Sequence, residues 1–324
     1  MARLILITIL LFLCNNVILG QSKPKRDSSK DFRTEMKNSN KNVTSEPNKN
    51  TFKPAVKKKN RNLQHQHTQE EFWGDQDDVF HDVCYAGTIV DYEDYLNDYP
   101  NGKYVDQAKA RINEIELSAE QGSAESKYRI GRCYYDKKWD PNYQKAIYWF
   151  KKAADQGYAE AQSTLGSCYY EGHGLSQDYQ QAIYWFKKAA EQGHAEAQFA
   201  LGLCYYEGHG LSQDCQQAIY WFKKAADQGE KDAQTFLGFF YLEGKSVPQD
   251  YEQAALLFKK AVAQRQVKAQ LGLGLCYLLG YGVSEDVQRG WYLIRKAADE
   301  GDEDAQAILN RVNEERAKNI NKEK

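Results

Sequence analysis

Seven cysteines and two Gly-His-Gly loops are the groups in this sequence with the most potential for covalent or metal chemistry. Four of the cysteines, Cys133, Cys168, Cys204 and Cys276, recur at one position of a repeated stretch. Equivalent helices of stacked units lie about 10 Å apart, whereas a disulfide needs Cα atoms within about 7 Å. We therefore predict four free, packed thiols, and the Phe240 that stands at this position in another unit indicates a buried apolar site.

The two loop histidines, His173 and His209, lie one repeat apart. A shared metal ion would need both ring nitrogens within about 2 Å, and a repeat spacing of about 10 Å prevents this. Lys245 and Tyr281 occupy the same loop position in later units, so we expect loop residues facing solvent, no metal site and no cofactor. The Ser-x-x-Lys pattern at Ser22–Lys25 lies in a polar tail with nothing to organise it, and no catalytic residue is assigned.

The elements that position these residues form a repeat of 36 residues. The copies at 159–193 and 195–229 are nearly identical, and further copies occur at 124–158, 231–266 and 267–302. A period in this range is typical of stacked units that share a continuous core.

Each unit is predicted to contain two helices. In the second unit, Ala161, Leu165 and Cys168 recur at helical spacing and mark the apolar stripe of the first helix. Gly172 then ends this helix, because glycine adopts a positive φ without steric cost, and Asp178 caps the next one. One hairpin cannot bury its own stripe. The fold class is therefore predicted to be all-α, a right-handed α-solenoid of stacked antiparallel helix pairs.

The repeated residues follow the pattern A-x-x-x-LG-x-x-Y, then G-x-G, the Asp of S-Q-D, and A-x-x-WF-x-KAA-x-QG. This pattern resembles the Sel-one-like repeat (SLR) family, which is related to tetratricopeptide repeats, over residues 124–302. The resemblance implies a scaffold that binds a protein or peptide partner, often in exported or host-associated settings. The alternative is a penicillin-hydrolysing enzyme, an activity attributed to cysteine-rich relatives. Those relatives pair cysteines near a K-A-C sequence, where this chain has Ala.

The segments before the repeats differ from them in composition. Residues 1–20 carry one charge, Arg3, followed by an apolar run, which is typical of a secretory signal peptide. Residues 21–68 are predicted to be a disordered basic linker, because 21–62 hold 13 Lys and Arg against 4 Asp and Glu and almost no large apolar residues. We expect a periplasmic, cell-surface or secreted protein whose linker makes weak contact with anionic surfaces. A membrane-tethered adaptor is the alternative if residues 1–20 are not cleaved.

From residue 63 onward the charge reverses to −12, although the whole chain carries only −2. This acidic body argues against nucleic acid as the ligand of the solenoid. Residues 69–122 are predicted to form a helical capping module, and residues 303–324 a C-terminal capping helix with a frayed tail from 317. We expect a monomer.

Variation inside the repeat gives the candidate partner-binding residues. The first-helix positions opposite the apolar stripe change from unit to unit while the rest of the pattern is kept. They are Tyr128, Arg132, Ser163, Ser167, Phe199, Leu203, Thr235, Phe239, Leu271 and Leu275. One interpretation is a groove on the concave face, polar near its N-terminal end and apolar near its C-terminal end, since exposed apolar patches commonly mark binding sites. The other is that the apolar members pack against neighbouring first helices.

Overall fold

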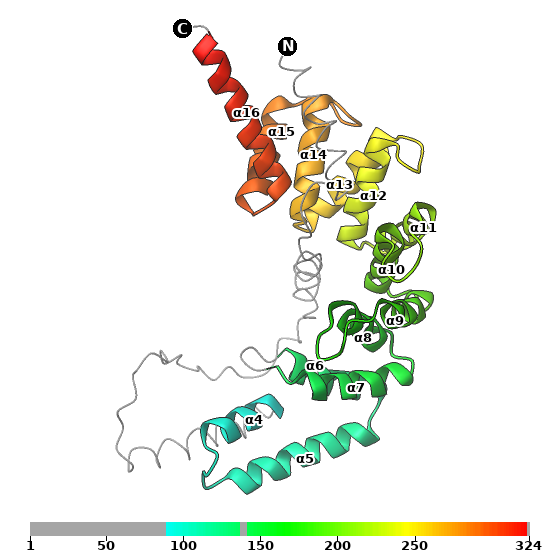
Figure 1. Ribbon diagram of the computed structural model, residues 1–324, viewed down its shortest axis with the longest axis vertical. Coiled ribbons are helices and arrows are strands. Elements are labelled where there is room, and N and C mark those ends of the chain that lie inside the picture. The colour runs from blue at the N-terminus through cyan, green and yellow to red at the C-terminus, as the bar shows by residue number, and fades with distance from the viewer. Residues whose placement is uncertain (1–88, 137–140, 323–324) are drawn as a thin grey trace, which may run out of the picture. The chain divides into compact units, whose positions relative to one another are not determined.

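The computed structural model describes residues 89–136 and 141–322, which form helices α4 to α16 and contain no strand (Figure 1). The described residues belong to two compact units, 89–177 and 178–322. The predicted signal peptide, the basic linker and the first part of the capping module, residues 69–88, lie outside the described residues.

The N-terminal unit contains five helices: α4 (Ile89–Asp98), α5 (Val105–Gln121), α6 (Ala124–Tyr135), α7 (Tyr143–Asp155) and α8 (Ala159–Glu171). Both α4 and α5 pack against α6, the first helix of the first repeat. The buried Tyr134 on α6 donates a hydrogen bond to Glu116 Oε1 at 2.6 Å, and Lys145 Nζ on α7 donates to the Tyr134 hydroxyl at 3.1 Å. These bonds join α5 to the first helix pair.

The C-terminal unit contains eight helices: α9 (Tyr179–Glu191), α10 (Ala195–Glu207), α11 (Cys215–Asp227), α12 (Lys231–Glu243), α13 (Tyr251–Ala263), α14 (Val267–Leu279), α15 (Val287–Asp299) and α16 (Glu303–Lys322). Here α10 packs on α11, α12 on α13 and α14 on α15, and each pair also contacts the next one. The fold is therefore all-α, a stack of antiparallel helix pairs, as the sequence predicts.

In four of the five repeats the helix boundaries follow from the same capping residues, a glycine after the first helix and an aspartate before the second. Gly172 ends α8 with a φ of 76°, and Asp178 begins α9 by accepting a hydrogen bond from the Gln181 backbone N–H at 3.0 Å. Within a pair the helices approach closely at a glycine. A Cβ added to Gly202 on α10 would lie 2.7 Å from the Phe222 ring on α11, so a larger residue would push the two helices apart.

The apolar stripe of the first helices lies between successive repeats. In α14 the stripe residues Ala269, Leu273 and Cys276 cluster with Ala254 and Phe258 of α13, the second helix of the preceding repeat. The sequence predicts that one hairpin cannot bury this stripe by itself and that neighbouring repeats must cover it. The structure agrees with this prediction, because the stripe packs at the junction between one repeat and the next.

The C-terminal helix is longer than expected. The tail predicted to fray from residue 317 is helical as far as Lys322, in keeping with the Ala, Lys, Glu and Arg that the sequence supplies there. Along residues 89–136 and 141–322, none of the helices combines the length and the apolar character needed to cross a membrane.

Candidate binding surfaces

The predicted first-helix positions in the C-terminal unit are buried. Phe199, Leu203, Thr235, Phe239, Leu271 and Leu275 are each 7 % exposed or less. A partner could reach these side chains only if neighbouring helices moved apart.

The contacts of these residues explain their burial. The Phe199 ring on α10 lies 5.6 Å, centroid to centroid, from Phe222 on α11 and 5.6 Å from Phe236 on α12. Leu271 and Leu275 on α14 belong to a cluster that also contains residues of α15 and α16. These positions therefore face the second helix of their own pair and the first helix of the next repeat. This is the packing alternative that the sequence left open.

In the N-terminal unit the same positions carry mostly polar residues. Tyr128 is half-buried, its ring lies 5.6 Å from Phe150, and its hydroxyl shares a hydrogen bond of 3.3 Å with Thr164 Oγ1 on the next first helix. Arg132 donates from Nη1 to the Tyr128 hydroxyl at 3.1 Å. Ser163 is buried, and Ser167 donates from its half-buried hydroxyl to the Ser163 carbonyl at 3.2 Å. Partner binding by this polar set stays a prediction.

The structure exposes a different repeated position, on the second helices. Five of the seven exposed large hydrophobic residues among those described occupy this position: Tyr148, Tyr184, Tyr220, Leu256 and Tyr292. The four in the C-terminal unit, Tyr184, Tyr220, Leu256 and Tyr292, are called the second-helix row below. The sequence contains a sign of this position, an aromatic residue on the polar side of the amphipathic second helix. A search for positions that vary between repeats does not find it, because the tyrosine is kept in most repeats.

Lysines accompany the row. Lys188 Nζ lies 4.5 Å from the centroid of the Tyr184 ring, and Lys224 Nζ lies 4.8 Å from that of Tyr220. Such cation–π contacts hold the ring face and the charge together at the surface. A further exposed lysine, Lys187 or Lys223, precedes each of these two. The second helices thus present aromatic rings within a local excess of positive charge, although the body of the chain is acidic.

A pair of carboxyl groups, the half-buried Glu230 and the buried Asp232, lies at the start of α12. Glu230 accepts a hydrogen bond from the Ala233 backbone N–H, and Asp232, 3 % exposed, accepts one from Gln266 Nε2. Burial, and secondarily the Asp232 carboxylate, raises the pKa of Glu230 well above its usual range. Burial likewise raises the pKa of Asp232. The pair therefore retains a proton at pH values where exposed carboxyl groups are ionised.

The loop histidines have separate carboxylate partners. His173 Nδ1 lies 2.9 Å from Glu171 Oε2, and His209 Nδ1 lies 2.9 Å from Glu207 Oε2. Both rings are partly buried, which differs from the solvent-facing position we expected. The bond to Glu207 raises the pKa of His209. Within the described ranges there is no group of three or more His, Cys, Asp or Glu residues that could hold a metal ion.

The four cysteines predicted to be free thiols, Cys133, Cys168, Cys204 and Cys276, are free, and so is Cys215, the other cysteine within the described ranges. Burial raises the pKa of the Cys168 thiol to about 12, and the pKa of Cys276 likewise to about 12. Such thiols are poor nucleophiles, because the thiolate is the reactive form. They contribute to packing.

The chain belongs to the Sel1 repeat family. The Sel1 repeat model matches five consecutive segments, 124–158, 159–194, 195–230, 231–265 and 267–302, which confirms the resemblance and the five predicted repeats. Sel1 repeats commonly form protein–protein interaction scaffolds and are generally not enzymes.

Two solved structures share the fold. A Sel1 repeat protein from Oxalobacter formigenes is 34 % identical with a TM-score of 0.55, and the match covers 62 % of this chain and 59 % of that one. The protein c5321, described as a protective antigen present in uropathogenic Escherichia coli strains and displaying an SLR fold, is 30 % identical with a TM-score of 0.55, covering 73 % of this chain and 51 % of that one. The chain thus spans between half and three-fifths of the length of these proteins. No curated protein matches it.

Proposed function

We propose that this protein is an exported scaffold that binds an acidic segment of a partner protein along the second-helix row. The observation that carries the proposal is the repeated exposure of one position. Tyr184, Tyr220 and Tyr292 are 47 %, 48 % and 64 % exposed. By contrast, the predicted first-helix residues Phe199, Phe239 and Leu275 are each 7 % exposed or less. Tyrosine supplies a large contact area and a hydrogen-bonding hydroxyl, which is why it is enriched in protein interfaces.

The charge around the row supports an acidic partner. Lys188 and Lys224 lie over the tyrosine rings, so a partner that contacts a ring also meets an ammonium group. Electrostatic complementarity of this kind mainly accelerates association and selects among partners. Binding should therefore weaken as salt concentration rises.

Two observations support export. Residues 1–20 have the form of a signal peptide, and the E. coli relative is described as a protective antigen. The test is the mass of the mature chain purified from its native cells. We expect an N-terminus near Gln21. A chain that retains residues 1–20 would contradict this proposal and favour a membrane-tethered adaptor.

The binding test compares two triple variants of the tagged full chain, each changing one position on three second helices. Tyr184→Ser/Tyr220→Ser/Tyr292→Ser removes the exposed rings. The matched control is Gln181→Ser/Gln217→Ser/Gln253→Ser, which changes exposed side chains on second helices of the same unit. Proteins captured from the envelope and medium by each variant are quantified by mass spectrometry at low and high salt.

We expect at least one acidic protein that the wild type and the glutamine variant capture and that the tyrosine variant loses. Loss of about 2 kcal/mol per anchor corresponds to roughly thirtyfold weaker binding, so capture should fall to background. Equal capture by all three chains would exclude the row as the binding surface. Capture that disappears after nuclease treatment would identify nucleic acid as the ligand and overturn the proposal.

A further inference from the structure

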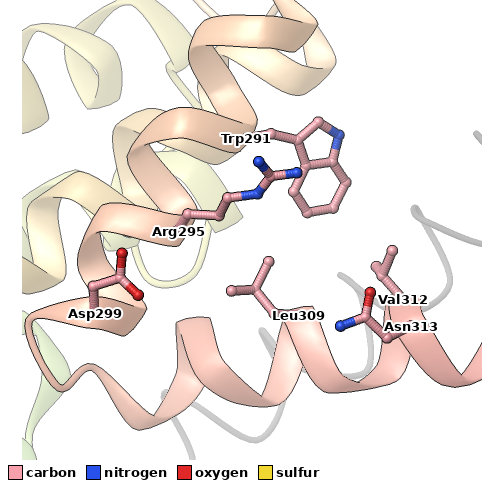
Figure 2. Close-up of a pocket in the computed structure, with 6 residues that line it drawn as sticks. All are labelled: Trp291, Arg295, Asp299, Leu309, Val312 and Asn313. Carbon is pink, nitrogen blue, oxygen red and sulfur yellow. The ribbon is translucent and has the colours of Figure 1, made fainter.

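A cavity of about 250 Å³ lies in the C-terminal unit between α15 and α16. It is lined by Trp291, Arg295, Asp299, Leu309, Val312 and Asn313. Figure 2 shows the side chains of α15 and α16 pointing toward one another across this space, with the indole and guanidinium groups on one side and Leu309 and Asn313 on the other. None of the second-helix row residues lines the cavity.

At two of the earlier junctions a tyrosine ring lies near the equivalent cation. Lys223 on α11 lies with its Nζ 5.8 Å from the ring centroid of Tyr241 on α12, and in the N-terminal unit Lys151 lies 5.9 Å from Tyr169 in the same way. At the α15–α16 junction the cation is kept as Arg295, but the position of the tyrosine is occupied by Asn313. The α15–α16 junction thus keeps the cation but lacks the tyrosine ring that lies near it at these two junctions.

The lining of the cavity is correspondingly less covered. Leu237 and Phe240 on α12 are 4 % and 1 % exposed, whereas Leu309 and Val312, which take their places on α16, are half-buried. These aliphatic side chains keep apolar surface in contact with water, and an apolar occupant would gain about 25 cal/mol for each Å² that it covers.

A helix placed after α16 would not approach it as closely as the two helices of a pair approach each other in the repeats. Within the repeats the first helix presents Gly202 or Gly238, where an added Cβ would lie 2.7 Å from the phenylalanine ring of the second helix. On α16 the equivalent residue is Asn310, which is exposed. The Asn310 side chain would hold such a helix farther from α16, and Asn310 itself does not line the cavity.

We propose that this cavity is a docking pocket for one aromatic side chain of a partner protein. Its lining complements such a group in charge: the Arg295 guanidinium can lie over the ring face, and Asp299 and Asn313 can pair with the peptide N–H and C=O groups beside it. The cavity volume of about 250 Å³ also suits a single side chain. Pockets that hold whole small ligands are larger, commonly about 300–1,000 Å³. The chain's own Lys–Tyr pairs at the earlier junctions show the arrangement that the partner would reproduce.

The test follows the Trp291 indole N–H signal of the full chain by NMR during titration with two capped peptides, Gly-Ser-Tyr-Ser-Gly and Gly-Ser-Leu-Ser-Gly. The decisive variant is Asn313→Tyr, which supplies the ring from the chain itself. Ala307→Tyr is the matched control, because it adds the same side chain to an exposed position of α16 that does not line the cavity. Arg295→Gln, which leaves the cavity open, serves as a second test of the cation.

We expect the tyrosine peptide to shift the Trp291 signal in the wild type and in Ala307→Tyr, and the leucine peptide to bind at least about tenfold more weakly. Asn313→Tyr should abolish the shift while the melting temperature stays equal or rises, since the ring fills the cavity. Arg295→Gln should weaken binding about two- to fivefold, the range for an exposed cation–π contact.

Three results would overturn the proposal. They are a wild type that does not respond to the tyrosine peptide, an equal response to both peptides, and undiminished binding by folded Asn313→Tyr. A wild type that self-associates in sedimentation velocity, with self-association lost in Asn313→Tyr, would assign the pocket to a second copy of this chain instead. Failure here leaves the second-helix row untouched, because the row is tested by separate variants.

Discussion

Phe199 and Tyr220 belong to neighbouring helices of one repeat and lie in opposite environments. Phe199 on α10 is 5 % exposed and packs against rings on α11 and α12, whereas Tyr220 on α11 is 48 % exposed beneath a lysine. A first helix is covered by its own second helix and by the helices of adjacent repeats, while a second helix keeps one face in solvent. The exposed repeated position is therefore the better candidate for partner binding.

The largest expected effect comes from removing buried rings of the first helices. The double variant Phe199→Ser/Phe239→Ser should lose the cooperative melting transition in circular dichroism. Each large-to-small change in the core costs about 3–5 kcal/mol, and a folded domain has only about 5–15 kcal/mol available. A transition close to that of the wild type would show that these side chains are not core and would restore the groove interpretation.

The carboxyl pair at α12 should give an intermediate effect that depends on pH. A raised pKa in the folded state stabilises the fold at low pH, and this stability is lost as pH rises from the unfolded value through the folded one. Glu230→Gln keeps an oxygen that can accept from Ala233 and removes the ionisation. We expect the variant to be more stable than the wild type at pH 9, by about 1–2 kcal/mol, with little difference at pH 4.5.

Urea unfolding at the two pH values measures this difference. The matched control is Glu252→Gln, an exposed carboxylate on α13, which should change stability equally little at both pH values. An unchanged pH dependence in Glu230→Gln would show that the carboxyl pair does not retain its proton.

Removing the exposed rings should have a small effect on stability. Tyr184→Ser/Tyr220→Ser makes the same kind of aromatic-to-serine change as the first-helix variant, at two exposed positions. Each substitution removes a cation–π contact of about 0.5–1 kcal/mol, so the cooperative melt should persist with a slightly lower midpoint. Loss of the cooperative melting transition, as in the first-helix variant, would show that the second-helix tyrosines are as important for the core as the first-helix phenylalanines.

The smallest effect is expected from reduction. Cys168, Cys204 and Cys276 are buried free thiols, so a reducing agent should leave the melting temperature of the full chain unchanged. Alkylation under denaturing conditions, with and without prior reduction, counts the free thiols and serves as the control. A large fall in melting temperature after reduction would show that disulfides hold the stack.

The repeat made the fold predictable, because residues such as Gly172 and Asp178 recur at fixed offsets and have local physical roles in ending and starting helices. The environment of Phe199 was not predictable in this way. Burial at its position depends on where adjacent repeats place their helices. The residue pattern of one helix pair does not specify the angle at which the next pair packs against it. Tyr220 carried a readable signal, namely an aromatic residue on the charged side of an amphipathic helix.

Hydroxyl-radical footprinting of the full chain, alone and with its captured partner, tests the central claim most directly. In the free protein we predict rapid modification of Tyr184, Tyr220 and Tyr292 and slow modification of Phe199 and Phe239, in line with their exposure. The partner should protect the three tyrosines and leave both phenylalanines unchanged. Rapid modification of Phe199 and Phe239 that the partner suppresses, with the tyrosines unaffected, would contradict the account and return the binding surface to the first helices.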